Sequence, residues 1–143
     1  VMVLVIVSVA SHARHQQVST YWENFDEDES AAIGLMKAGL TAARQQNLNT
    51  ADSLAALCST AANAADDVPG KVGALLLQAQ IAEDRGDMEE SFRHFYAALE
   101  LDNELEPNSL MRQFLHREVG IAYGKLGTPH AKELICAQEV ACR

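Results

Sequence analysis

Histidine is the residue type in this chain best suited to metal binding or proton transfer, so the spacing of the histidines is the first test for chemistry. His12 and His15 lie three residues apart and would share one face of a helix. No cysteine or carboxylate stands at ligand spacing beside them, so they are interpreted as a polar flank of the apolar segment that precedes them. His94, His116 and His130 are scattered one to a helix and are interpreted as structural residues.

Sequence motifs of catalysis are missing. The chain has no phosphate-binding P-loop, no G-x-S-x-G, no H-E-x-x-H and no dinucleotide-binding glycine pattern. We therefore predict no catalytic residue, no metal, no cofactor and a protein that is not an enzyme.

The three cysteines divide into one core candidate and one pair. Cys58 falls at a small, packed position and is predicted to lie in the core. Cys136 and Cys142 are six residues apart, which in a continuous helix separates them by about 9 Å along the axis, too far for a disulfide. A bond would require the helix to end near Glu139 and an oxidising compartment, and both states stay open.

Composition indicates one helical domain. The chain has 143 residues, of which 48% are hydrophobic, enough for a sizeable core. Alanine and leucine are abundant and β-branched residues are scarce after the first twenty positions, which favours helices. The net charge of −9, without a cluster of basic residues, argues against a nucleic-acid partner.

A continuous apolar run, Val1 to Ala10, opens the sequence. Ten residues are fewer than the ~20 that a helix needs to span a bilayer. Three readings compete: the end of a transmembrane anchor, the hydrophobic part of a secretory signal, and a buried strand or helix start. The favoured anchor reading predicts membrane contact through Val1 to Ala10, with the acidic body on the non-cytoplasmic side, as in a bacterial periplasm.

Three aromatic residues, Tyr21, Trp22 and Phe25, follow in a connector that ends in acidic residues. Beside a membrane they would mark the interfacial belt, and in a soluble protein they would form a flap over the first hairpin. Both alternatives stay open.

Apolar residues at spacings of three and four predict six helices in three antiparallel hairpins. The helices are expected at about 30–46 and 50–65, 71–85 and 87–100, and 109–126 and 129–141. Within the central hairpin, Gly86 is expected to take the left-handed conformation and Asp87 to cap the next helix. Asp28 or Ser30 is expected to cap the first helix.

Stop signals are expected at two places. Asn47 to Asn49 should end the first helix, with a new helix from about Thr50. Pro69 and Gly70 are interpreted as the stop after the second helix.

The hairpins repeat at a spacing of about 40 residues, which lays Leu35 on Leu75 and Leu115, and Gly39 on Ala79. The central copy resembles a tetratricopeptide repeat. The positions that carry this resemblance are Ala79, Gly86, Asp87, Ser91, Phe95, Ala98 and Leu99; the third copy matches with Gly120, Tyr123, Gly127 and Ala131, and the first with Gly39, Ala51 and Cys58. The period exceeds the family's usual length of about 34 residues, which indicates longer connections or a related helical-hairpin repeat.

The predicted fold class is therefore all-α, with three stacked antiparallel helical hairpins after an apolar N-terminal segment. The expected divisions are an apolar segment with a polar flank at 1–17, a connector at 18–29 and a repeat domain at 30–143, with repeats at about 30–70, 71–108 and 109–143.

The resemblance implies that the first helices of the hairpins line a concave groove that binds a partner's peptide or helix. The groove positions that it implies are Lys37, Leu40, Arg44, Leu76, Gln80, Glu83, Asp84, Arg117, Ile121 and Lys125. Basic residues at both ends could hold an acidic group. The family's carboxylate clamp of paired Lys and Asn is not reproduced, so we expect a groove without a clamp.

The function expected from these features is a non-enzymatic protein–protein interaction scaffold or adaptor, associated with a membrane. The alternative is a structural accessory subunit of a larger membrane complex. A small-ligand binder or enzyme that uses the groove is a minor alternative. Partner loss on changing the groove residues would favour the adaptor.

Overall fold

The computed structural model describes residues 21–26 and 29–126, and every regular element within those ranges is a helix. The elements are the 3-10 turn η1 (Tyr21–Asn24), the α-helices α2 (Ala31–Arg44), α3 (Leu48–Ala65), α4 (Val68–Asp84) and α5 (Met88–Glu100), the 3-10 turn η2 (Asp102–Glu104), and α6 (Leu110–Leu126). The all-α fold class is confirmed. The helix expected at 129–141, the apolar run Val1 to Ala10, and the pair Cys136 and Cys142 lie outside the described residues.

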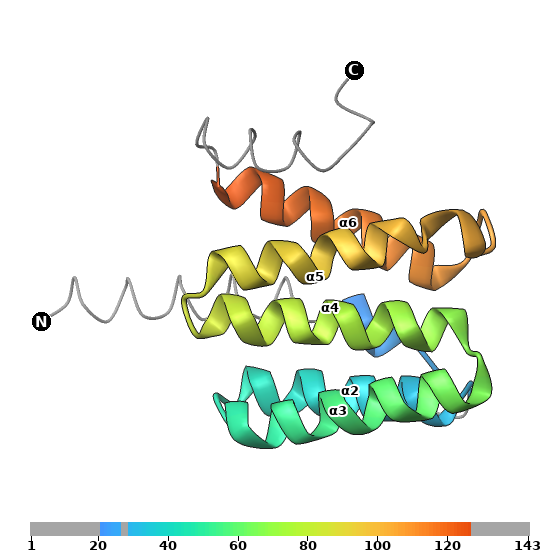
Figure 1. The fold of residues 1–143 in the computed structure, drawn as a ribbon, viewed down its shortest axis with the longest axis horizontal. Coiled ribbons are helices and arrows are strands. Elements are labelled where there is room, and N and C mark those ends of the chain that lie inside the picture. Colours follow the sequence, from blue (N-terminus) through green and yellow to red (C-terminus); the bar gives the residue numbers. More distant parts are fainter. Residues whose placement is uncertain (1–20, 27–28, 127–143) are drawn as a thin grey trace, which may run out of the picture.

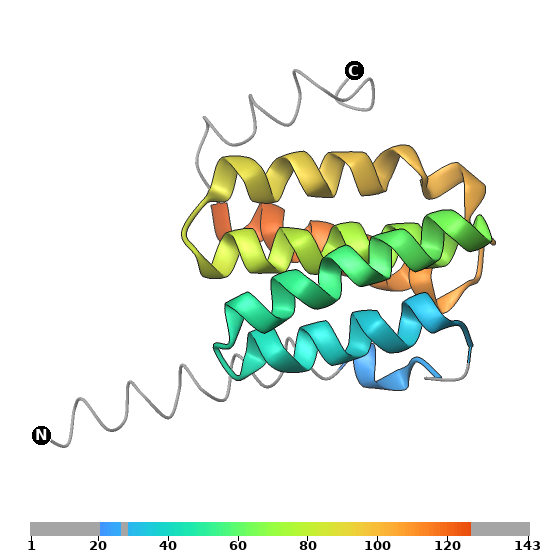
Figure 2. The ribbon, with the colours of Figure 1, turned by 60° about the horizontal axis from the view of Figure 1, so that its bottom comes forward.

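Helix α4 is the centre of the fold. It packs against α2, α3, α5 and α6, and Figure 1 shows it between α3 and α5. In Figure 1, α2 lies behind α3 and α6 passes behind α5, and in the turned view of Figure 2 α2 lies below α3 and α6 is seen between α5 and α4. Because α4 has neighbours on several sides, its buried residues do not follow a single stripe: Val72, Leu76, Leu77 and Ile81 are all buried, whereas Leu75 is half-buried.

Three turns between helices close in the same way. Gln46, Asp66 and Gly86 each have a positive φ, of 63°, 48° and 81°. The next residue in each turn donates its backbone N–H to the carbonyl five positions earlier, at 2.9 Å in all three cases. This is the Schellman closure of a helix C-terminus. The left-handed conformation expected at Gly86 is confirmed.

The same three turns supply the caps of the following helices. Asn47, Asp67 and Asp87 each accept a hydrogen bond from the backbone N–H three residues on. The caps expected at Asp87 and at Ser30, whose Oγ accepts from Ile33 N at 3.1 Å, are confirmed.

Two expected boundaries are wrong. Pro69 and Gly70 do not stop a helix; they stand in the first turn of α4, where proline needs no backbone N–H and its fixed φ suits the helix. Asn47 is a cap rather than part of a break, so α3 begins at Leu48 and not near Thr50.

Small residues allow α2 and α4 to approach closely. A Cβ on Gly39 would lie 2.3 Å from Leu77 Cδ2, and one on Gly70 would lie 2.7 Å from Ala32 Cβ. Both distances are shorter than van der Waals contact, so an added methyl group would require Leu77 to move at the first position and the backbone of the helices to move at the second.

The paired positions inside the hairpins are also small and buried. Ser91 is fully buried, and its Oγ–H donates to the carbonyl of Ala79 at 2.9 Å. The corresponding pair in the first hairpin, Gly39 and Ala51, is buried too. The buried Ser91 hydroxyl needs no water as a partner, because the Ala79 carbonyl accepts its hydrogen bond.

None of the helices that the structure describes is both long and apolar enough to cross a membrane.

Candidate protein-binding groove

The candidate groove, called the trough below, is the region where α2 and α6 both pack against α4. The three helices meet at Gly73 of α4, where an added Cβ would lie 2.7 Å from Met36 Sδ of α2 and 3.3 Å from Met111 Cε of α6. Glycine at this point leaves room for the two methionine side chains to converge over α4.

The chain's own segment 21–26 lies in this trough. Trp22 and Phe25 are 6% and 2% exposed and belong to the same core as the helices around them. The Phe25 ring contacts the Phe114 ring of α6 edge-on, with centroids 5.5 Å apart and planes at 70°. In Figure 1 the blue η1 lies behind α4. Trp22 and Phe25 therefore pack onto the helices as a flap, which is one of the two alternatives for the aromatic cluster.

The groove residues expected on α2 hold this segment. Lys37 Nζ donates to the Phe25 carbonyl at 2.6 Å, and Arg44 Nη1 lies 3.2 Å from Glu23 Oε1. Leu40 is buried. Lys37 and Arg44 thus contact residues of their own chain, and Leu40 is part of the core.

The groove residues expected on α4 are divided between core and surface. Leu76 is buried at 3% exposure. Gln80 Nε2 donates to Asp84 Oδ1 at 3.0 Å, one turn along the same helix. Gln80, Glu83 and Asp84 are half-buried and lie in the last turns of α4.

On α6, Arg117 is exposed and Ile121 is half-buried. The side chain of Lys125 lies outside the described residues. Sequence analysis missed Phe114, which is 2% exposed and forms the aromatic contact with Phe25. Its signal was present, because Met111, Phe114 and Leu115 are apolar residues at spacings of one, three and four in the helix expected at 109–126.

A hollow of about 240 Å³ opens where the first turns of α3, the end of α4 and the start of α5 come together. It is lined by Asp52, Gln78, Ile81, Ala82, Arg85, Asp87, Glu90 and His94. Its charges are already paired: Arg85 with Asp52, and His94 Nε2 with Glu90 Oε1 at 3.2 Å. Within the described ranges, no three histidine, cysteine or acidic side chains come together as a metal-binding group.

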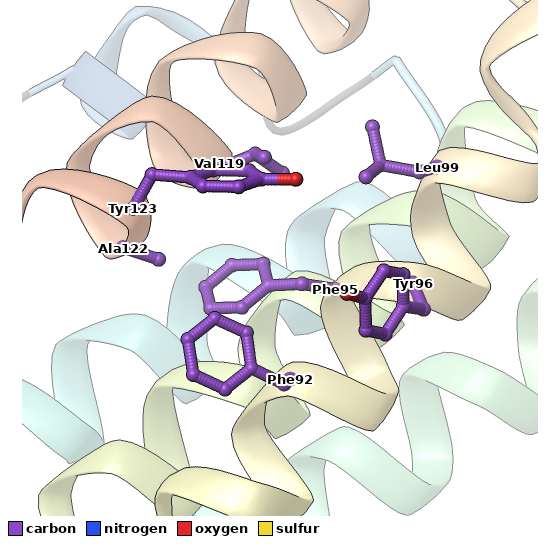
Figure 3. A pocket seen from close by; sticks show the side chains of 7 residues that line it. All are labelled: Phe92, Phe95, Tyr96, Leu99, Val119, Ala122 and Tyr123. Carbon is purple, nitrogen blue, oxygen red and sulfur yellow. The ribbon is translucent and has the colours of Figure 1, made fainter. Parts of the chain in front are cut away.

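A narrow apolar crevice separates α5 from α6. Figure 3 shows side chains of the two helices facing each other across it. The lining residues are Phe92, Phe95, Tyr96, Leu99, Val119, Ala122 and Tyr123. The crevice carries no polar surface, so it offers shape but no directional contact to a ligand.

Cys58 lies in the core, as expected. Its side chain is fully buried, and Sγ lies 3.1 Å from the Ala32 carbonyl and 3.9 Å from the Gly70 carbonyl. Burial, reinforced by the charge of Asp67, raises the pKa of the thiol to about 11. A thiol with such a pKa is a structural residue rather than a nucleophile.

Comparison of the chain with protein-family models, curated proteins and solved structures finds no match. The interpretation of the trough therefore rests on its own geometry and on the helical repeats of the sequence.

Proposed function

We propose that this protein is a non-enzymatic interaction scaffold, built from helical hairpins similar to tetratricopeptide repeats, and that the trough formed by α2, α4 and α6 binds a segment of a partner protein. The trough takes a short peptide segment through buried side chains and a backbone contact. The proposal depends on the way segment 21–26 is held. Two of its aromatic side chains are buried, and its Phe25 carbonyl accepts a hydrogen bond from Lys37.

The stacked helices support this role because they make the trough rigid. Glycine at positions 39, 70 and 73 fixes the distance between α2 and α4, and the three similar turns fix the ends of four helices. A rigid surface loses little conformational entropy when a segment docks on it.

Association with a membrane is a separate part of the proposal. It rests on the apolar run Val1 to Ala10, which lies outside the described residues. Fractionation of cells that produce the intact chain or a chain without residues 1–17 tests it, and equal recovery of both in the soluble fraction would contradict it.

The groove is tested by quantitative affinity capture from native extract with the intact chain and an Arg117→Glu/Ile121→Glu variant. These two positions on α6 are expected at the trough, and changing them leaves the contacts of Lys37 and Arg44 with segment 21–26 in place. Arg93→Glu is the matched control, because Arg93 is an exposed α5 cation whose ion pairs with Glu89 and Glu90 are worth little.

A stoichiometric partner that is lost only in the α6 variant would support binding of the partner in the groove. Retention in both variants, with loss when residues 1–17 are removed, would overturn it in favour of a structural subunit of a membrane complex.

A further inference from the structure

Segment 21–26 is a model of the ligand that the trough recognises. We propose that the trough binds, in exchange for this segment, a partner peptide with two aromatic residues three positions apart and an acidic residue between them. This inference rests on the proposed scaffold function and adds the chemistry of the partner.

The two aromatic side chains act together because of the 3-10 turn. Phe25 N donates to the Trp22 carbonyl at 3.2 Å, which closes the turn. In a 3-10 helix, side chains at positions i and i+3 project in the same direction. Trp22 and Phe25 therefore enter the trough side by side, and a partner needs the same spacing to place two rings there.

The trough supplies a matching surface for the rings. Phe114 meets Phe25 edge-on, an arrangement that aromatic pairs favour over direct face-to-face stacking. Met36 and Met111 converge over Gly73. These methionines belong to the same core cluster as Trp22 and Phe25, and methionine adapts its shape to its neighbours, so a core of this kind tolerates more than one aromatic residue type.

Two polar contacts determine where the bound peptide lies and which charge it should carry. Lys37 Nζ donates to the Phe25 backbone carbonyl at 2.6 Å, a contact that any residue at that position could make. Arg44 pairs with Glu23 at 3.2 Å, and both side chains are well exposed. An exposed pair contributes little affinity but disfavours a basic residue between the two rings.

Tethering determines how exchange must be measured. A segment linked to its own site acts at an effective concentration in the millimolar range, so a free peptide competes poorly with it. The trough must be emptied before weak binding in trans can be seen.

The first experiment uses the full chain with Trp22→Ser and Phe25→Ser and a fluorescein-labelled peptide of residues 18–29. We expect fluorescence anisotropy to detect binding to the emptied variant, and binding to the unaltered chain that is at least about tenfold weaker, since there the tethered segment competes. A peptide with serine at both aromatic positions is the control and should not bind. Adding Lys37→Met to the emptied variant should weaken binding of the aromatic peptide.

The second experiment does not require the variant to fold. Trp22 is the one tryptophan of the chain, so its emission reports whether segment 21–26 is docked. The competing peptide carries phenylalanine in place of its tryptophan. We expect millimolar peptide to shift the Trp22 emission to longer wavelength as the segment leaves the trough.

Failure of a folded, emptied variant to bind the peptide, or an unchanged Trp22 emission at saturating peptide, would make segment 21–26 a permanent part of the core and overturn the inference. A concentration-dependent dimer that Trp22→Ser and Phe25→Ser abolish would also overturn it, since the occupant would then be a second copy's segment.

The two proposals can fail separately. Partner capture that depends on Arg117 and Ile121, without peptide binding, would leave the scaffold function and remove only this ligand assignment. Peptide binding without groove-dependent capture would contradict the scaffold function.

Discussion

The junction of α3 with α4 and the junction of α5 with α6 are built differently. At the first, two residues, Asp66 and Asp67, separate the helices, which pack extensively. At the second, residues 101–109 intervene, the helices touch only slightly, and a crevice lined by aromatic residues lies between them. Small side chains and a tight turn bring helices together, whereas large rings and a long connection hold them apart.

The polar contacts of the two junctions differ as well. At the first junction Cys58 is buried, and its Sγ contacts backbone carbonyls of α2 and α4. At the second, Arg112 donates to both oxygens of Asp102, at 3.1 and 3.2 Å, and His116 Nε2 lies 2.8 Å from Oδ1. Tight packing positions α4, and a side-chain ion network helps to position α6.

The largest expected effect is a loss of folding stability at alkaline pH, caused by Cys58 at the first junction. The Cys58 pKa is raised from 9.0 to about 11 in the folded protein. Above pH 9 the unfolded chain loses this proton while the folded chain keeps it, so stability falls as the pH rises toward 11. The two-unit shift corresponds to at most about 3 kcal/mol. Urea unfolding between pH 8 and 11 should show a steeper decline for the natural chain than for Cys58→Ala, and equal slopes would contradict a sealed junction.

An added methyl group should have opposite effects at the two junctions. Gly70→Ala places Cβ 2.7 Å from Ala32 Cβ and 2.5 Å from Asp67 Oδ2, and should cost about 2 kcal/mol through overpacking. Gly120→Ala on α6 meets no atom within 4 Å, and should gain about 1 kcal/mol because alanine favours the helix. Thermal and urea unfolding measure both. A loss for Gly120→Ala would show that α6 is as closely packed as α4.

The smallest effect is expected at Asp102. Burial acts to raise its pKa, but hydrogen bonds and charges from His116 and Arg112 outweigh burial and lower it. The carboxylate therefore stabilises the fold above its unfolded pKa, and this contribution disappears as the pH falls. Asp102→Asn should cost about 1 kcal/mol at pH 7. The cost should shrink in acid, and a constant cost would assign the effect to packing rather than charge.

The sequence predicted the helices and the central turn, because these depend on local signals. Gly86 and Asp87 are a recognisable stop and cap. Pro69 was misread because the left-handed residue that ends α3 is Asp66 rather than glycine, which moved the apparent stop three residues onward.

The groove itself stays a prediction. Lys37 and Arg44, two of its expected positions, contact segment 21–26. A flap over the first hairpin was one of the two alternatives for the aromatic cluster, but a helical pattern does not indicate which helices a distant segment will pack against. The contact of Phe114 with Phe25 was not predicted for a similar reason, since it joins two segments far apart in the sequence.

The contact of Phe25 with Phe114 also has a consequence for the order of folding. Nearly the whole described chain lies between these two residues, whereas the helical hairpins close over short loops. Loop-closure entropy delays contacts between distant residues, so we expect the hairpins to form first. During synthesis, segment 21–26 emerges before every helix described here, yet it acquires its full set of neighbours only after α6 has been made. Until then its two rings remain exposed to any other apolar surface in the cell.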